Sequence, residues 1–259
     1  MKFNVMTFNL RYNNPDDQEN AWPNRIDSVH GMIKKQNPDV FGIQEGLYSM
    51  LMDLSDILDE YHWFSDGRDG EQEGEFSAIF YKKETVDVIN TGQFWLSETP
   101  EVPGSVSWES AFPRVCTWGH FRINAEPTKE FSFYNTHLDH ISEEAREKGV
   151  QLIWKTMTKH WERKKRPSIL TGDMNATPSS KAIQFLRRQE ELVDTYQYIK
   201  GKVGATFHGF RGGSEGEPID YIFVTKDITV YAITVDRSKV NGKYPSDHYP
   251  VVGCLSPPE

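Results

Sequence analysis

The chain has 259 residues, of which 37% are hydrophobic and 26% charged, and its formal net charge at pH 7 is −9. The acidic balance argues against tight, sequence-independent binding of duplex nucleic acid, which depends on Lys and Arg neutralising phosphates. No window approaches the roughly 18 consecutive apolar residues of a membrane-spanning helix, so we expect no membrane association. Because no Gly/Ser-rich or Pro-rich linker and no internal repeat divides the chain, we expect a single domain over 1–259.

The cysteines and the amino terminus predict the cellular compartment. Cys116 and Cys254 lie in apolar, strand-like runs and are expected to be buried thiols, since a disulfide framework would need more cysteines. Asn4 and Thr7 interrupt what would be the apolar core of a signal peptide, so this stretch is predicted to be the first strand. We therefore expect a cytoplasmic protein. A secreted one would require a leader ahead of Met1.

Apolar runs and helical spacings predict ten strands and four helices. In chain order these are a strand at 2–8, a helix at 25–36, a strand at 39–44, a helix at 47–58, strands at 76–82, 86–95, 115–123 and 131–137, a helix at 142–161, a strand at 168–172, a helix at 179–189, and strands at 219–224, 228–235 and 250–255. Several strands are apolar on both faces, which is typical of strands buried between layers. This order favours two packed, mixed sheets flanked by helices.

Three long polar connections separate these elements. We expect 65–75 to be a solvated loop, because it is rich in Gly and in turn dipeptides. The connections 96–114 and 201–218 contain aromatic residues and Arg, and long loops in compact domains are usually functional.

Polar side chains stand where apolar runs meet loops. They are Asn9, Glu45, His137, Asp173, Asn175, Asp247 and His248. Sheet ends are where a rigid scaffold presents side chains to a cleft. We interpret this set as the site of a hydrolase that uses a hard metal ion to cleave phosphoesters.

At these positions the chain resembles the endonuclease/exonuclease/phosphatase superfamily, the magnesium-dependent DNase I-like phosphoesterases. The matching motifs, in the order of that family, are Thr7-Phe8-Asn9, Gln44-Glu45, Thr136-His137-Leu138, Gly172-Asp173-Met174-Asn175, Ile219-Asp220-Tyr221-Ile222 and Ser246-Asp247-His248. The chain looks closer to the small bacterial members, because it lacks a basic arm and an aromatic membrane hairpin. The resemblance implies an α/β protein (α+β in some schemes), a four-layer α/β/β/α sandwich of two mixed, mostly antiparallel sheets flanked by helices.

The resemblance also implies a metal ion. Mg²⁺ prefers oxygen ligands, commonly one or two carboxylates, and Mn²⁺ is an alternative. Glu45 is the leading ligand, because a Glu that ends an apolar strand is otherwise poorly placed. The alternative is that Glu45 is only an acid at the start of the helix that follows. Asp247 would add negative charge on the metal side.

The catalytic roles are likewise those that the resemblance implies. Asp173 would accept a hydrogen bond from the attacking water, with Asn175 on the same side of the extended segment and Asn9 as a second neutral donor. The remaining catalytic residues are His137, Asp220 and His248. His137 would donate to a phosphate oxygen, and Asp220 would fix the ring of His248. Whether His248 acts as the base or as a phosphate clamp stays open.

A second group of residues is expected to select the substrate. It consists of Arg25, Arg114, Arg146 and His208, which we expect to converge in one cleft around Glu45. Arg suits bidentate recognition of phosphate, and a negatively charged protein needs a local concentration of donors to capture an anion. Either Trp95 or Phe210 is expected on the wall of this cleft.

The sequence thus predicts a Mg²⁺- or Mn²⁺-dependent phosphoesterase that hydrolyses a phosphomonoester or phosphodiester on a small or single-stranded substrate. One alternative is a DNA endonuclease or exonuclease with the same chemistry, although duplex nucleic acid is disfavoured. Another is an interaction module that kept the fold and lost catalysis. We expect the protein to be a monomer.

Overall fold

The computed structural model describes residues 2–258. The strands are β1 (Phe3–Asn9), β2 (Val40–Gln44), β3 (Tyr61–Phe64), β4 (Ile79–Lys82), β5 (Val86–Trp95), β6 (Val115–Ile123), β7 (Glu126–His137), β8 (Ser168–Asp173), β9 (Leu192–Asp194), β10 (Asp220–Thr225), β11 (Thr229–Val235) and β12 (Val251–Ser256). The α-helices are α1 (Ile26–Gln36), α2 (Tyr48–Ile57), α3 (Glu143–Arg163) and α4 (Lys181–Arg187). Short 3₁₀ helices cover Pro15–Asn20, Trp22–Asn24 and Thr195–Tyr198.

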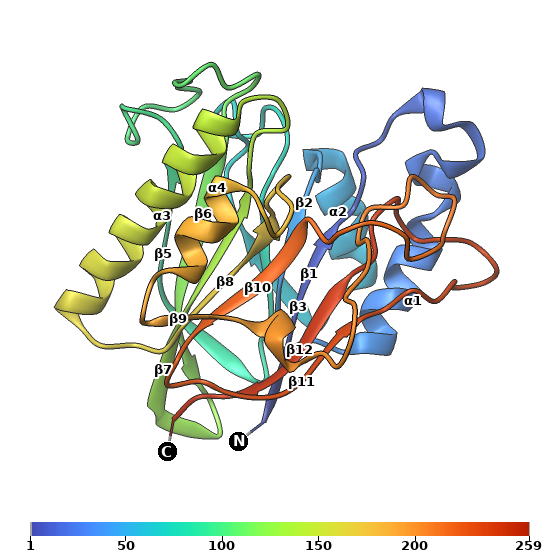
Figure 1. Ribbon diagram of the computed structural model, residues 1–259. Coiled ribbons are helices and arrows are strands. Elements are labelled where there is room, and N and C mark those ends of the chain that lie inside the picture. The colour runs from blue at the N-terminus through green and yellow to red at the C-terminus, as the bar shows by residue number, and fades with distance from the viewer. Residues whose placement is uncertain (1, 259) are drawn as a thin grey trace.

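Within residues 2–258 the strands form two six-stranded sheets. One has the order β11-β12-β1-β2-β4-β3 and the other the order β5-β6-β7-β8-β10-β9. The pairs β1–β2 and β7–β8 are parallel, and the remaining neighbours are antiparallel. Figure 1 shows α1 and α2 on one side of the strands and α3 and α4 on the other. The structure is the four-layer sandwich of mixed, mostly antiparallel sheets that the resemblance implied.

Alternation along each strand decides which layer its side chains meet, because successive side chains point to opposite faces. In β1, Phe3 and Val5 belong to the core between the sheets, whereas Met6 and Phe8 pack in a second core with α1 and α2. Burying both faces leaves no polar face on the strand. This explains why apolar residues occupy both faces of β1, with Thr7 and Asn9 as buried polar residues near its end.

The predicted helices are all present, each within a few residues of its expected bounds. At the start of α3, the Ser142 side chain accepts a hydrogen bond from the backbone N–H of Ala145 at 3.1 Å, as expected for an N-cap. The sequence missed β3 and the three-residue β9, which are too short to show alternation. Cys116 is buried as expected. Cys254 is only half-buried, like Val252 two residues before it on the same face of β12, and both thiols are free.

A buried polar cluster joins the two sheets. The Asn135 side chain on β7 donates to the carbonyls of Ile43 (2.8 Å) and Ala78 (3.1 Å) on the opposite sheet. Its oxygen accepts hydrogen bonds from Gln44 (2.7 Å) and Thr171 (3.1 Å). All four hydrogen-bonding positions of this amide are therefore occupied, and they tie β2 to β7 and β8 just below the strand ends.

None of the helices among the described residues has both the length and the apolar character needed to cross a membrane.

His120 makes stability sensitive to acid. Burial lowers its pKa to about 4, helped by the positive charge of Arg166. The unfolded chain binds a proton near pH 6.5 while the folded chain does not, so stability should fall as pH drops from 6.5 to 4. We expect His120→Gln to flatten this fall by up to about 3 kcal/mol, since one pKa unit is worth 1.36 kcal/mol. Urea unfolding at several pH values measures it, and equal slopes for variant and wild type would contradict the assignment.

Candidate active site

The polar strand ends meet at one end of the sandwich, between the sheets. Asn9 points to the same face of β1 as Val5, and Asp173 to the same face of β8 as Thr171, so both face the opposite sheet. Asn9 Nδ2 donates to Asp173 Oδ2 at 2.9 Å, which links the two sheets directly. His137 Nε2 lies 3.5 Å from the same carboxylate oxygen.

Glu45 reaches this point through an unusual backbone conformation. As a plain continuation of β2 it would point toward the helices, as Ile43 does. Its φ of 58° is rare for a residue other than glycine and turns the chain out of the strand. Glu45 Oε1 accepts from Asn9 Nδ2 at 3.0 Å, and Oε2 accepts from the Tyr12 N–H at 3.1 Å. The carboxylate is therefore held beside Asp173.

His248 is oriented by a buried carboxylate. Its Nδ1 lies 2.9 Å from Asp220 Oδ2, and its Nε2 lies 3.7 Å from Asp173 Oδ2. Burial opposes a charge on the imidazole, but the two carboxylates more than offset that, so the pKa of His248 lies well above its ordinary value. The raised pKa favours the imidazolium form, whose Nδ1–H would donate to Asp220 and whose Nε2–H would face Asp173.

Asp173 lies among partners of both signs. Burial raises the pKa of its carboxyl, and the Asp220 carboxylate raises it further, while His248 and the hydrogen bonds from Asn175 and Asn9 oppose this rise. Asp173 Oδ1 accepts from the Asn175 N–H at 2.9 Å. A raised pKa lies closer to neutral pH, which makes this carboxylate a better proton acceptor.

His137 stays neutral. Burial lowers its pKa well below the ordinary value, and the positive charge of Arg114 lowers it further. Asn175 Nδ2 lies 3.0 Å from His137 Nε2 and 2.9 Å from the Leu138 carbonyl. Because a carbonyl only accepts, the amide must donate, and the proton of His137 is therefore on Nδ1. That N–H points toward Glu75 Oε2, 3.8 Å away.

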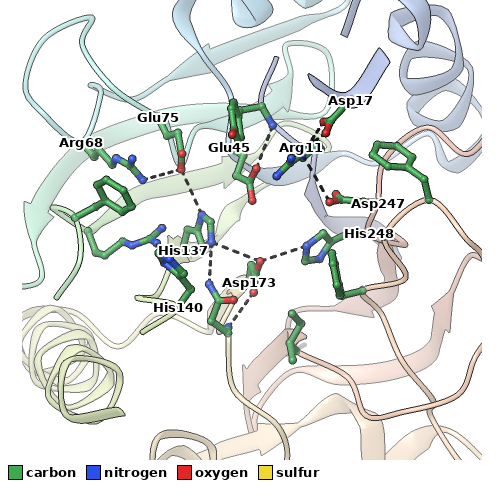
Figure 2. A pocket seen from close by; sticks show the side chains of 18 residues that line it. Arg11, Asp17, Glu45, Arg68, Glu75, His137, His140, Asp173, Asp247 and His248 are labelled. Atoms are coloured by element: carbon green, nitrogen blue, oxygen red, sulfur yellow. Dashed lines mark hydrogen bonds and ion pairs between the residues drawn. The ribbon is translucent and has the colours of Figure 1, made fainter. Parts of the chain in front are cut away.

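Asp247 approaches the site from the loop before β12. Burial raises the pKa of its carboxyl, and the charge of Glu45 raises it further. Its Oδ2 lies 3.9 Å from Arg11 Nε, although Arg11 is already paired with Asp17 at 2.8 Å. Figure 2 shows Arg11 and Asp247 beside His248, across Asp173 from Arg68 and Glu75.

The donor set suits a divalent cation. One ligand atom each from Glu45, Asp173 and His248 lie within 4.8 Å of one another. The carboxylates of Glu45 and Asp173 are the harder donors, with Asp247 nearby, whereas Nδ1 of His248 already contacts Asp220 at 2.9 Å. Oxygen donors of this kind fit a hard ion such as Mg²⁺. A bound cation would also offset the cost of burying several acids close together.

These groups open into a cleft with a volume of about 790 Å³. Six of the predicted catalytic and metal-binding residues line it, namely Glu45, His137, Asp173, Asn175, Asp247 and His248. Asn9 and Asp220 lie behind them, in contact with Asp173 and His248. The structure thus brings all eight residues of that set together.

The expected convergence of the substrate-selecting residues is wrong for three of the four, because only Arg114 lines the cleft. Arg25 is buried and donates to backbone carbonyls, including those of Leu10 at 2.6 Å and Pro245 at 2.9 Å. It therefore braces the loops behind the site. The other two residues also lie outside the cleft. Arg146 donates to the Asp139 carbonyl at 2.9 Å, and His208 stacks on Tyr249 with ring centroids 3.9 Å apart.

The cleft has the expected aromatic residue on its wall. Phe210 lines the cleft and Trp95 does not. The indole N–H of Trp95 donates to the Arg68 carbonyl at 2.6 Å, so Trp95 supports the loop that forms one wall.

The expectation that 65–75 is merely solvated is also wrong. Arg68 and Glu75 line the cleft and form an ion pair of 2.8 Å. Backbone hydrogen bonds from Gly67 to Glu71 and from Arg68 to Glu75 fold the loop on itself. No periodicity marks such a loop, and the only sequence signal is an Arg and a Glu among turn residues. The sequence also gave no indication of Arg11, Tyr12 and Asp17, which line the opposite end.

Comparisons with known proteins agree with this site. Residues 6–248 match the sequence profile of the Endonuclease/Exonuclease/phosphatase family. A family protein from Bacteroides vulgatus is 36% identical, with 99% of each chain covered and a TM-score of 0.92. The mannosyl-6-phosphatase of Bacteroides thetaiotaomicron is 34% identical over 98% of this chain and 99% of its own, also with a TM-score of 0.92.

An uncharacterized protein of Acanthamoeba polyphaga mimivirus is 24% identical over 251 residues, which cover 89% of this chain and 91% of the viral one. The profile match spans every motif of the site, from Thr7 to His248. The chain therefore belongs to the endonuclease/exonuclease/phosphatase family, whose members are hydrolases that act on phosphoester bonds.

Proposed function

We propose that the protein is a divalent-metal-dependent phosphomonoesterase that releases phosphate from a small ester. The observation that carries the proposal is the Asn9–Asp173–His248–Asp220 chain of contacts beside Glu45, at the base of a cleft with walls at both ends. The net charge of −9 disfavours long nucleic acids as substrates. The 34% identical mannosyl-6-phosphatase supports a small sugar phosphate as the substrate.

In this proposal each buried group has one task. A divalent ion held by Glu45 with Asp173 or Asp247 would supply positive charge for the phosphate oxygens. Asp173 accepts a hydrogen bond from the attacking water and takes its proton as the new P–O bond forms. His248, kept protonated by Asp220, donates from Nε2 to a phosphate oxygen as charge grows there. The ester P–O bond breaks, the leaving oxygen takes up the proton that Asp173 received from the water, and the products are an alcohol and orthophosphate.

Three further side chains hold the charged groups of the site in position. Asn175 and His137 form a hydrogen-bonded pair at the edge of the cleft, 3.0 Å apart. Asn9 holds Glu45 and Asp173 together from below, with both contacts near 3 Å. These contacts fix the positions of Glu45, Asp173 and His137 before the substrate binds, so the groups that meet the phosphate need little reorganisation during the reaction.

Metal dependence tests the proposal. We expect phosphate release from small monoesters to stop in EDTA and to return with Mg²⁺ or Mn²⁺. Glu45→Gln should raise the metal concentration that gives half-maximal rate by about tenfold or more, because an anionic ligand is replaced by a neutral amide. Glu71→Gln, an exposed residue outside the cleft, is the matched control.

The same assay separates the alternatives. Cleavage of DNA without release of phosphate from any monoester would favour a nuclease. Absence of turnover with every metal and every substrate class would contradict an enzymatic role and favour an interaction module.

A further inference from the structure

The two ends of the cleft differ in chemistry. At one end lie Arg68, Glu75, Phe112, Arg114 and His140, which we call the Arg68 subsite. At the other end lie Arg11, Tyr12, Asp17, Phe207, Phe210 and Asp247. Figure 2 shows Arg68, Glu75 and His140 on one side of His137, and Asp247 and Arg11 on the other. The reacting groups lie between the two ends, so one end is available to each half of a small ester.

The Arg68 subsite has balanced charge. Arg68 Nη1 contacts Glu75 Oε2 at 2.8 Å, and Arg114 Nε lies 3.7 Å from Asp139 Oδ1. The two cations are therefore each beside a carboxylate. A second phosphate would add negative charge where both guanidinium groups already have anionic partners. The subsite thus suits a neutral group better than a second anion.

Donors and acceptors nevertheless remain available there. Among residues 2–258 the structure gives no hydrogen-bond partner to Arg68 Nη2 or Arg114 Nη1, whereas Arg114 Nη2 contacts His140 Nδ1 at 3.1 Å. Glu75 is an acceptor with one oxygen in the ion pair and a second oxygen to spare. Hydroxyl groups both donate and accept, so they match an array that alternates guanidinium donors with a carboxylate acceptor.

An aromatic ring completes the subsite. Phe112 is 44% exposed, Arg68 lies 4.4 Å from its centroid, and the His140 ring stacks on it at 5.9 Å with an interplanar angle of 17°. An aromatic ring beside several convergent polar groups is a common arrangement in small-ligand sites. It suits the flat C–H face of a saturated ring.

The subsite is held in place by its surroundings. Asp139 accepts hydrogen bonds from the backbone N–H groups of Ala111 (2.9 Å), Ile141 (2.9 Å) and Ser142 (2.7 Å). This fixes the end of the 96–114 loop against the start of α3. Trp95 fixes the 65–75 loop through the Arg68 carbonyl. A site formed before the ligand arrives loses less entropy on binding.

The other end is less suited to an alcohol. Arg11 donates hydrogen bonds from both Nε and Nη2 to Asp17, at 2.8 and 3.0 Å. With Asp247 and Glu45 nearby, this end carries an excess of carboxylates. Such a charge favours a cation and the phosphate bound to it.

We infer that the Arg68 subsite binds the alcohol half of the substrate, and that this half is a polyhydroxylated ring such as a hexose. The inference rests on the proposed function, and it assigns the choice of leaving group to Arg68, Glu75 and Phe112. The Glu75 carboxylate accepts from ring hydroxyls, Arg68 donates to them, and Phe112 packs against the ring.

A matched pair of substrates tests this inference. Mannose 6-phosphate and cyclohexylmethyl phosphate have the same ring size and the same methylene bridge to phosphate, but only the first has ring hydroxyls. We expect wild type to show a clearly higher kcat/KM for the sugar phosphate. Glu75→Gln and Phe112→Ala should each lower the ratio of the two kcat/KM values by about tenfold, the effect of losing one good hydrogen bond or its supporting contact.

Phe207→Ala at the opposite end is the matched aromatic control. Phe207 packs on His248 with ring centroids 5.0 Å apart, so its loss should change the rates of both substrates alike and leave the ratio within about twofold. Circular dichroism of each variant reports its folding. The inference is overturned if Glu75→Gln and Phe112→Ala lower both substrates in parallel, or if Phe207→Ala is the variant that changes the ratio. Wild type that hydrolyses both esters equally also overturns it and leaves the proposed function standing. Hydrolysis of neither ester overturns the proposed function itself.

Discussion

Asp173→Asn is expected to lower kcat by roughly 10²–10³ or more at saturating metal, the scale of losing a preorganised transition-state contact. The carboxylate lies 2.9 Å from Asn9 and 3.7 Å from His248, and burial and Asp220 raise its pKa toward the range of a useful base. Asparagine has nearly the same shape but cannot accept a proton. Steady-state phosphate release over a range of metal concentrations measures the effect and separates it from weaker metal binding.

The control for this prediction is Asp236→Asn, which changes another buried aspartate outside the cleft. Asp236 accepts a hydrogen bond from Lys35 at 2.6 Å and should affect stability without affecting kcat. His248→Ala should resemble Asp173→Asn, because it removes the cation that Asp220 holds at the phosphate. A kcat near that of wild type in either active-site variant, at saturating Mg²⁺, would show that these roles are wrongly assigned.

The position of the site followed from the sequence because strand geometry carries the information. Side chains alternate between faces, so a polar residue two positions beyond a core residue points toward the same layer. Asn9 follows Val5 and Thr7 in this way, and Asp173 follows Thr171. The resemblance then supplied the pairing of strands that places these ends together. Strand pattern and strand order therefore account for the meeting of Asn9 and Asp173, whereas the place of Glu45 depends on a backbone turn with a φ of 58° that the strand pattern does not predict.

The walls of the cleft did not follow, because they depend on loops and on long-range contacts. Arg25 directly precedes α1 and Arg114 directly precedes β6, so the two arginines look alike in the sequence. The guanidinium group of Arg25 donates hydrogen bonds to backbone carbonyls of distant loops, including that of Pro245, and no local sequence pattern reveals these bonds. Arg68 and Glu75 lie in a Gly-rich loop whose internal hydrogen bonds have no periodic signature. Backbone strain at Glu45, with a φ of 58°, is equally invisible in the sequence.

Gly42→Ala is expected to destabilise the protein by about 3 kcal/mol, at the upper end of the range for overpacking a core. Gly42 lies on β2 where the sheets face each other, directly below Glu45. A Cβ atom there would clash with the Asn135 side-chain oxygen and would come within 2.8 Å of Thr171 Oγ1. The Asn135 amide cannot move freely, because it is bonded to the carbonyls of Ile43 and Ala78. Urea unfolding measures the loss.

A double-mutant cycle shows whether the clash or a general loss of strand stability is responsible. Asn135→Ala removes the obstructing amide, so Gly42→Ala should cost much less in that background than in wild type, with coupling of about 1 kcal/mol or more. Additive effects would place the strain elsewhere. Since the Asn135 amide also accepts from Gln44, the neighbour of Glu45, the clash should shift Glu45, the proposed metal ligand, relative to Asp173. Gly42→Ala should therefore weaken metal activation even at temperatures where the variant is fully folded, whereas a change that only lowered stability would leave metal activation unaltered.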